Sequence, residues 1–356
     1  MNILIVKTSA IGDVIHTLPA LNCLRQHFPE AHITWLIEEA AVDIVQGHPA
    51  LDRVLIVRRK EWIRMWRQGQ RLAALQQALR FAQTVRDTRY DLLIDFQNLL
   101  KSSIWVALAH AKRKIGYGSG MDHSEMSYVF LNERIPAVSM DQHAVDRELQ
   151  LLRSIKIDCK DVVFDLPVSN GSRHSALDLL RTSGASSGRP LVAINPMTTW
   201  PTKHWQDEKF ALLADRLVDE GNTVVFTGGE NDRQAIGSIC AMMRNEVPNL
   251  AGQTSLKELA ALYGLAKALI TTDTGPMHIA AAVGTPVVAL FGPTAPWRTG
   301  PYGDKNRVIR LAISCSPCLK KECPLGTTAC MKQIMVEDVV AAVNPLLSAP
   351  GSGKGE

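Results

Sequence analysis

The sequence contains no apolar run long enough to cross a bilayer. The longest one, around residues 279–291, is broken by Gly284 and Pro286 and falls short of the roughly 20 residues that a spanning helix needs. The first residues enter a predicted strand directly, without the basic region or the cleavage site of a signal peptide. We therefore expect the protein to stay in the cytoplasm.

An even number of cysteines is also lacking, because the chain has seven. An odd number without a secretion signal argues against a disulfide framework and predicts that most thiols are free. Four of the seven follow a C-x2-C-x4-C-x6-C spacing at Cys315, Cys318, Cys323 and Cys330. This spacing could ligate zinc or an iron–sulfur cluster, although such cysteine knuckles usually come as pairs with a longer gap. The alternative is free thiols in a loop.

The net charge is only +4, but the basic residues form two clusters. The first is interleaved with two tryptophans and comprises Arg58, Arg59, Lys60, Arg64, Arg67 and Arg71. The second comprises Lys112, Arg113 and Lys114. Because no nucleic-acid-binding motif accompanies them, we expect no nucleic-acid partner. A membrane surface or a phosphorylated glycolipid suits the first cluster, and the alternative is a solvated helix face whose tryptophans belong to the core.

The 356 residues, 46% of them hydrophobic, are enough for two domains, and each half alternates strands with helices. In the first half we expect strands at 2–7, 32–37, 54–57 and 92–96, and helices at 14–28, 64–85 and 102–110. A connecting region with a helix at 172–182 and the Ser/Gly-rich residues 183–188 follows. The predicted first domain is 1–170.

In the second half we expect strands at 191–195, 223–227, 266–272 and 285–290, and helices at 209–220, 232–242 and 256–265. The predicted second domain is 188–335, followed by a helix at 336–348 and a disordered tail at 349–356. The alternation predicts an α/β fold of two Rossmann-like, doubly wound domains facing a cleft. Ligands of such sheets bind at the carboxyl ends of the strands.

The segment 273–293 carries the clearest binding signal. Asp273, Thr274 and Gly275 follow a buried strand directly, and Pro276 is suited to be the first helical residue. The free N–H groups of residues 274–278, with the helix dipole behind them, can bind a phosphate. In the alternative interpretation Asp273 only caps the helix and Thr274 is only a turn residue.

Two further turns follow strands of the second half. Thr198, Thr199 and Lys203 lie in a hydroxyl-rich turn, where the lysine can neutralise a diphosphate, unless it is an ordinary surface residue. Glu230 follows two glycines and can accept hydrogen bonds from ribose hydroxyls, unless this is a plain turn.

The first strand is followed by Gly12 and Asp13 near the start of a helix. The carboxylate of Asp13 can take a proton from an acceptor hydroxyl, or it can cap the helix. A G-x-G-x-x-G fingerprint is absent, so nicotinamide dinucleotide binding is poorly supported.

Six motifs occur in order: VKTSAIGDVIHTLPAL, DFQNLLKS, HAVDR, TT…KHW, TGGE and DTGPMHIAAAVGTPVVALFGPT. Together they resemble the lipopolysaccharide heptosyltransferases, from residue 1 to about 345, and heptosyltransferase I more than heptosyltransferase II. The resemblance implies the GT-B arrangement and inverting transfer of L-glycero-D-manno-heptose from ADP-heptose to the Kdo of Kdo2-lipid A. It also implies that no cofactor or catalytic metal is required, and a peripheral position on the cytoplasmic face of the inner membrane.

The resemblance also implies residue roles. Asp13 matches the general base, and Lys203 matches a residue that stabilises the departing diphosphate. The donor contacts would be Thr198, Thr199, Lys203, Glu230, Asp273, Thr274, Gly275 and His278. The acceptor contacts would be Ser9, Asp13, Arg58, Arg59, Lys60 and Lys101. The alternatives are a heptosyltransferase acting later on the core and, in another class, a non-catalytic nucleotide- or nucleic-acid-binding protein.

Overall fold

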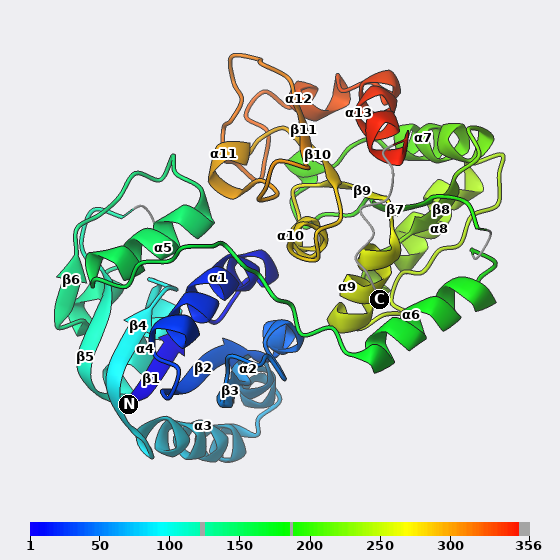
Figure 1. Cartoon of the computed structure of the whole chain (residues 1–356). Coiled ribbons are helices and arrows are strands. Elements are labelled where there is room, and N and C mark those ends of the chain that lie inside the picture. Colours follow the sequence, from blue (N-terminus) through cyan, green and yellow to red (C-terminus); the bar gives the residue numbers. More distant parts are fainter. Residues whose placement is uncertain (122–124, 186–187, 349–356) are drawn as a thin grey trace. The chain divides into compact units, whose positions relative to one another are not determined.

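The computed structural model describes residues 1–121, 125–185 and 188–348. The chain forms two compact units, Met1–Pro167 and Val168–Glu356. Each unit is a parallel sheet with helices on both faces (Figure 1), which confirms the predicted α/β doubly wound class. The tail predicted at 349–356, and Ser186 and Ser187 of the Ser/Gly-rich segment, lie outside the described residues. None of the helices in the described part combines the length and apolarity that a membrane crossing requires.

The first sheet has the order β3-β2-β1-β4-β5-β6, with all strands parallel. Its strands are β1 (Asn2–Val6), β2 (His32–Glu38), β3 (Arg53–Val57), β4 (Arg89–Asp95), β5 (His110–Tyr117) and β6 (Glu133–Ile135). In the central pairings Ile3 lies beside Ile33 of β2 and Leu92 of β4. The strand order reverses between β1 and β4, where a doubly wound sheet opens a crevice for ligand.

Five helices and two short 3-10 turns complete the first unit. They are α1 (Ile11–His27), η1 (Glu39–Ile44), α2 (Arg59–Arg67), α3 (Arg71–Arg86), α4 (Leu100–Leu108), η2 (Ser127–Phe130) and α5 (Ala144–Ser154). Helices α1 and α5 pack together on one face of the sheet, and α2, α3 and α4 cover the other. The apolar core on the second face includes Leu4, Leu93, Trp105 and Val85.

The single helix predicted over 64–85 is wrong, because two helices occupy this segment. Helix α2 ends at Arg67, and α3 starts at Arg71. Gly69 lies between them with a φ of +84°. This left-handed backbone suits glycine and ends a helix, so the glycine divides what the apolar spacing alone makes continuous.

The second sheet has the order β11-β10-β9-β7-β8, again with all strands parallel. Its strands are β7 (Leu191–Asn195), β8 (Thr223–Phe226), β9 (Ala268–Thr272), β10 (Val287–Phe291) and β11 (Arg307–Arg310). The strand predicted at 191–195 is confirmed to the residue. Here the order reverses between β7 and β9, which are neighbours in the sheet.

The helices of the second unit are α6 (Asn170–Thr182), α7 (Asp207–Asp219), α8 (Arg233–Ala241), α9 (Leu256–Leu265), α10 (Gly275–Ala282), α11 (Pro296–Thr299), α12 (Ala329–Lys332) and α13 (Val336–Ser348). Two short turns are η3 (Pro201–Lys203) and η4 (Glu230–Asp232). Helix α6 packs against α9, so the helix predicted as part of a connector belongs to the second unit. Helices α7, α8 and α13 share an apolar core on one face of the sheet.

One pair of cysteines departs from the expectation drawn from their odd number. Cys23 of α1 and Cys159 form a disulfide, with Cα atoms 5.4 Å apart. These residues are 136 positions apart in the sequence, so only the folded chain brings them together. The other five cysteines are free thiols, which agrees with the prediction that most would be.

Candidate functional site

The loop after β1 lies at the point where the first sheet reverses its strand order. The side chain of Gln97, just after β4, fixes this loop by accepting the backbone N–H of Thr8 at 2.8 Å and that of Ser9 at 3.0 Å. The Thr8 hydroxyl also donates to the same amide oxygen, at 3.0 Å. The loop after β4 therefore shapes the loop after β1, which leads directly into α1.

Asp13 lies in the first turn of α1 and is half-buried. Its Oδ2 accepts the backbone N–H of Ala10, the N-cap residue, at 2.9 Å. The helix-capping interpretation of Asp13 is thus realised in the geometry. A capping hydrogen bond to one oxygen does not prevent a carboxylate from accepting a proton, so the two roles are compatible.

Beneath this loop lies an ion pair that sequence reasoning missed. The ammonium group of Lys7 donates to Glu148 Oε1 of α5 at 2.8 Å and to the carbonyl oxygen of Phe96 at 2.9 Å. Burial by itself lowers the pKa of Lys7, but Glu148 and Asp13 raise it further, so the lysine stays charged. A lysine at the end of a strand and a glutamate within an amphipathic helix carry no pairing signal in the sequence.

A second buried carboxyl ends β4. Asp95 Oδ1 accepts the backbone N–H groups of Gln97 and Asn98 at 3.0 and 3.1 Å. Burial raises the pKa of Asp95 to about 6, even though these two hydrogen bonds and the nearby Lys7 lower it. This carboxyl was also missed, because in the sequence it belongs to an ordinary apolar strand.

Three of the predicted acceptor residues gather around Glu38, at the end of β2. The ammonium of Lys101 contacts the Ser9 hydroxyl and lies 3.9 Å from Glu38 Oε1. The guanidinium of Arg59 lies 3.4 Å from the same carboxylate oxygen. Ser9, Arg59 and Lys101 come from three separate segments, and the fold places them at one end of the sheet.

The remaining two predicted acceptor cations, Arg58 and Lys60, flank Arg59 in the chain but show no ion pair with Glu38 in the described structure. The exposed guanidinium of Arg58 lies 3.8 Å from Glu39 and 3.8 Å from Glu61. Lys60 instead lines an open hollow of about 420 Å³ on α2, together with Ile63, Arg64, Arg67 and Gln68.

Two of the three residues of the second basic cluster form ion pairs within the sheet. Lys112 and Arg113 of β5 pair with Asp91 at 2.9 Å and with Glu133 at 2.6 Å. Lys114 donates to the carbonyl oxygen of Val106 at 2.7 Å. Asp91 and Glu133 lie on the strands on either side of β5, so these two ion pairs help to join β4, β5 and β6.

In the second unit Lys203 and Asp273 meet where the strand order reverses. Lys203 Nζ lies 2.7 Å from Asp273 Oδ2 and donates to the Asp273 carbonyl oxygen at 3.3 Å. It also lies 4.5 Å from the centre of the Trp200 ring, a cation–π contact. The turns after β7 and β9, 70 residues apart in the chain, are joined by this pair.

Helix α10 begins beside this ion pair. Its first residue is Gly275, one residue earlier than predicted, with Thr274 at the N-cap and Pro276 in the first turn. The described structure gives the Thr274 side chain no capping hydrogen bond, but Pro276 has no N–H and the Met277 N–H donates to the Thr274 carbonyl oxygen at 3.2 Å. The predicted set of free N–H groups over 274–278 is therefore incomplete, and the positive end of the helix dipole is what favours an anion here. His278 is buried in the same helix.

The other predicted donor residues surround the carboxyl ends of β7 and β8. Thr198 is half-buried, with its hydroxyl 3.5 Å from the Trp200 backbone nitrogen, and Thr199 is exposed. Glu230 is exposed on η4 and lies 3.4 Å from Arg233. Gly252, which the sequence did not single out, has a φ of +73°, and a Cβ built on it would lie 1.9 Å from Glu230 Oε2. Its missing side chain leaves room for the glutamate.

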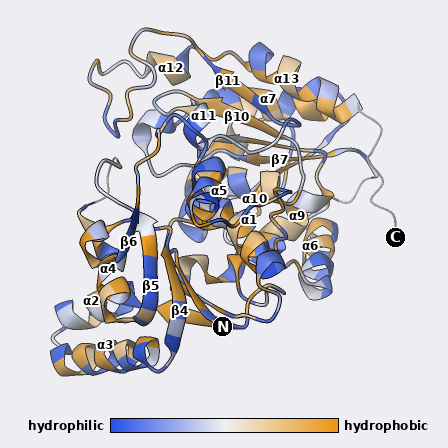
Figure 2. Cartoon of the chain, turned by 60° about the vertical axis from the view of Figure 1, so that its left-hand side comes forward, coloured by the Kyte–Doolittle hydropathy of each residue, from blue (hydrophilic) through white to orange (hydrophobic). Residues whose placement is uncertain are grey.

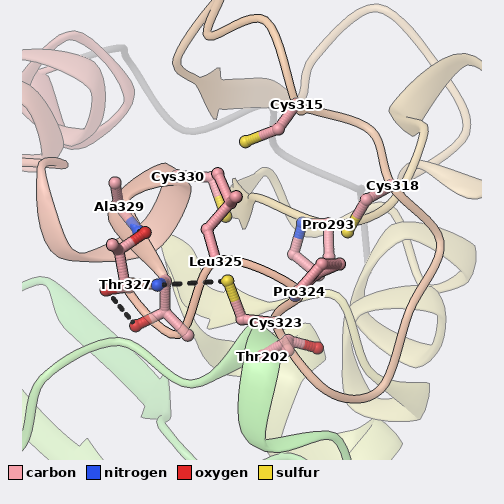
Figure 3. A pocket seen from close by; sticks show the side chains of 11 residues that line it. Thr202, Pro293, Cys315, Cys318, Cys323, Pro324, Leu325, Thr327, Ala329 and Cys330 are labelled. Carbon is pink, nitrogen blue, oxygen red and sulfur yellow. Dashed lines mark hydrogen bonds between the residues drawn. The ribbon is translucent and has the colours of Figure 1, made fainter.

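The four clustered cysteines line one apolar cavity of about 150 Å³ next to Thr202 and Pro293 (Figure 3). Within the described residues no three His, Cys, Asp or Glu side chains are placed to hold a metal ion, and the four thiols are free. The Thr202 hydroxyl donates to the carbonyl oxygen of Lys320 at 2.8 Å, which fastens the cysteine loop to the turn that carries Lys203.

The chain is similar to known proteins over most of its length. Residues 78–329 match the family described as glycosyltransferase family 9 (heptosyltransferase). The chain is 34% identical to lipopolysaccharide heptosyltransferase 1 of Pseudomonas aeruginosa, over 92% of this chain and 89% of that protein. It is 31% identical to lipopolysaccharide heptosyltransferase 1 of Escherichia coli, over 87% of this chain and 93% of that one.

Among solved structures, the Escherichia coli heptosyltransferase WaaC with ADP has a TM-score of 0.78 and 25% identity. That match covers 97% of this chain and all of the other (100%). The same enzyme with ADP-2-deoxy-2-fluoro heptose has a TM-score of 0.74 and 26% identity, over 97% and 99% of the two chains.

Proposed function

The chain belongs to glycosyltransferase family 9, the heptosyltransferases, and from this membership we propose the reaction that it catalyses. It transfers L-glycero-D-manno-heptose from ADP-heptose to the Kdo of Kdo2-lipid A. The observation that carries the proposal is the similarity to lipopolysaccharide heptosyltransferase 1 over most of the chain. A solved relative that binds an ADP-heptose analogue supports the donor.

The donor's diphosphate is bound where β7 and β9 meet. Lys203 and the positive end of the α10 dipole supply positive charge at this point. As the bond from the anomeric carbon to the phosphate oxygen breaks, negative charge grows on ADP, and these groups stabilise it. Glu230, in the space left by Gly252, accepts hydrogen bonds from the ribose hydroxyls, while Thr198 and Thr199 contact the phosphates.

The acceptor is bound by the first unit. Lys101 and Arg59 present cations to the Kdo carboxylates, and Ser9 contributes a hydroxyl beside them. Arg58 and Lys60 extend the positive charge along α2 toward the lipid A phosphates. Because Kdo2-lipid A is membrane-anchored, the enzyme works at the cytoplasmic face of the inner membrane, bound peripherally.

Asp13 acts as the general base. Its carboxylate takes the proton of the Kdo hydroxyl, whose oxygen attacks the anomeric carbon on the side opposite to ADP. A carbon–oxygen bond to Kdo forms as the bond to phosphate breaks, so the configuration at the anomeric carbon is inverted. The capping bond from Ala10 fixes the orientation of the carboxylate before the acceptor arrives.

The test compares Asp13→Asn with the unmodified enzyme on ADP-heptose and Kdo2-lipid A, following acceptor mass and ADP release. Asparagine keeps an oxygen for the Ala10 N–H but cannot take the proton, so the rate should fall by about 10²–10⁴ while the fold persists. Asp338→Asn is the matched control, because Asp338 Oδ2 caps α13 in the same way by accepting the Met335 N–H at 2.9 Å.

Three results would contradict parts of the proposal. Undiminished heptose transfer by Asp13→Asn would show that Asp13 is not the general base. Transfer only to an acceptor that already carries heptose would move the enzyme to a later step of core synthesis. Donor binding without any transfer would favour a non-catalytic nucleotide-binding protein.

A further inference from the structure

Helix α3 exposes an apolar stripe that the fold of the first unit does not use. Leu72, Leu75 and Leu79 are 78%, 50% and 54% exposed. Their spacing of three and four residues places them on one side of the helix. The opposite side packs into the core through Phe81 and the buried Val85. A row of three exposed leucines, unlike a single one, indicates a surface that meets a partner.

Helix α2 extends this apolar surface. It packs against α3 across the turn at residues 68–70, and Ile63 and Trp66 are 39% and 53% exposed. Figure 2 shows the two helices together at one end of the first unit, with hydrophobic and hydrophilic residues alternating along α3. We refer to residues 59–86 as the α2–α3 hairpin.

The charged residues around the leucines are all basic. Residues 62–86 contain no aspartate or glutamate and five arginines, at 64, 67, 71, 80 and 86. The described structure shows no ion pair for Arg64, Arg67 or Arg71, and Arg71 lies 5.6 Å from the centre of the Trp66 ring. The open hollow on α2, lined by Lys60, Arg64 and Arg67, adds a place where anionic groups can be received.

These features distinguish between two possible occupants of the hairpin surface, a second copy of the chain and a lipid surface. A second copy of the chain seated on the same surface would bring two sets of uncompensated arginines against each other, which is unfavourable. A lipid surface with anionic headgroups meets both requirements, because phosphates pair with the arginines and the acyl boundary accepts the leucines and Trp66.

We propose that the α2–α3 hairpin docks on anionic lipid, with the leucine stripe entering the boundary between headgroups and acyl chains. The proposal rests on the proposed function, since a lipid-anchored acceptor requires a membrane encounter, and it assigns that encounter to a defined surface. The hairpin begins at Arg59, which lies 3.4 Å from Glu38, so docking brings the membrane to the acceptor-binding end of the first sheet.

Vesicle binding tests the surface without any acceptor present. The full chain is sedimented with vesicles of phosphatidylcholine alone and with vesicles that also contain phosphatidylglycerol. We expect binding to the anionic vesicles, weakened at least about tenfold in the triple variant Leu72→Gln, Leu75→Gln, Leu79→Gln. Replacing Arg64, Arg67 and Arg71 with glutamine should weaken it by roughly a hundredfold at low salt.

The matched control replaces three exposed leucines of the second unit, Leu177, Leu212 and Leu265, with glutamine. This control should bind anionic vesicles like the unmodified chain. Equal losses in both leucine variants, or binding that ignores phosphatidylglycerol, would overturn the proposal. A dimer in sedimentation that the hairpin leucine variant abolishes would assign the surface to a second copy instead.

A transfer assay on a deacylated, water-soluble acceptor separates this proposal from the proposed function. The hairpin leucine variant should transfer heptose to that acceptor at the unmodified rate. If the unmodified chain transfers heptose but does not bind anionic vesicles, only the docking proposal is refuted. If it binds vesicles through the leucines but never transfers heptose, only the proposed function is refuted.

Discussion

Lys203 and Asp273 form an ion pair of 2.7 Å between two turns that the chain reaches 70 residues apart. Both side chains are largely buried, so the two charges hold each other in place. In the proposed donor site, the diphosphate therefore meets a cation that is already positioned. In the same proposal, the aspartate limits how much of the lysine's charge the donor can use.

Removing the lysine should weaken the binding of ADP. Lys203→Met eliminates a charge-assisted contact to phosphate, for which we expect a loss of about 10- to 100-fold in affinity, measured by calorimetry. Lys321→Met is the control, because Lys321 lies over the same Trp200 ring, at 5.5 Å, outside the ion pair. Equal losses in the two variants would show that only general positive charge matters.

Gly252 should be needed for donor binding through Glu230. Gly252→Ala places a Cβ against the glutamate at a positive φ, so it should displace Glu230 and weaken ADP binding. Gly221→Ala is matched, because its φ of +88° is similar and nothing lies within 4 Å of its Cβ. Both variants should lose about 1–2 kcal/mol of stability from backbone strain, measured by urea unfolding. A loss of affinity shared by Gly221→Ala would argue against the steric explanation.

Breaking the buried pair of Lys7 and Glu148 should destabilise the first unit. Lys7→Met leaves an uncompensated buried carboxylate, and the free energy of unfolding should fall by about 3–5 kcal/mol. The double variant Lys7→Met, Glu148→Leu should recover much of this loss, because no buried charge remains. Urea denaturation of both variants checks the prediction, and additive losses would contradict it.

Asp95 should make stability depend on pH. Its pKa of about 6 in the folded protein exceeds the ordinary value of 3.8, so its contribution is complete below pH 3.8 and is lost as the pH rises through 6. Asp95→Asn keeps an acceptor for the Gln97 N–H but never ionises. Its stability relative to the unmodified chain should therefore rise by about 2 kcal/mol between pH 4.5 and 7. A pH-independent difference would contradict the assignment.

The free cysteines should differ in reactivity. Backbone N–H groups, that of Thr328 at 3.4 Å among them, lower the pKa of Cys323. Burial raises the pKa of Cys330 and of Cys240. Iodoacetamide at neutral pH should therefore label Cys323 before Cys330 and Cys240, as followed by peptide mass mapping. Faster labelling of Cys240 would contradict the prediction.

Prediction from the sequence failed where something other than short-range apolar spacing decided the local structure. The apolar spacing over 64–85 continues across Gly69, yet the backbone of that glycine divides the helix. Strands β5, β6 and β11 were not predicted, since β5 starts with a basic run and the other two are short. The residues of these strands show no strand pattern of their own. The strands are stabilised by hydrogen bonds to neighbouring strands and, between β5 and β6, by the ion pair of Arg113 with Glu133.

The sequence by itself determined the alternation of strands and helices, the two doubly wound halves, and the polar turns that follow β1, β7 and β9. These features depend on short-range periodicity and on motifs of adjacent residues. The tertiary structure alone decided which distant side chains meet: Lys7 with Glu148, Lys203 with Asp273, and Cys23 with Cys159. The order of the strands in each sheet brings these distant residues together. That order cannot be read from the residues next to each of them in the chain.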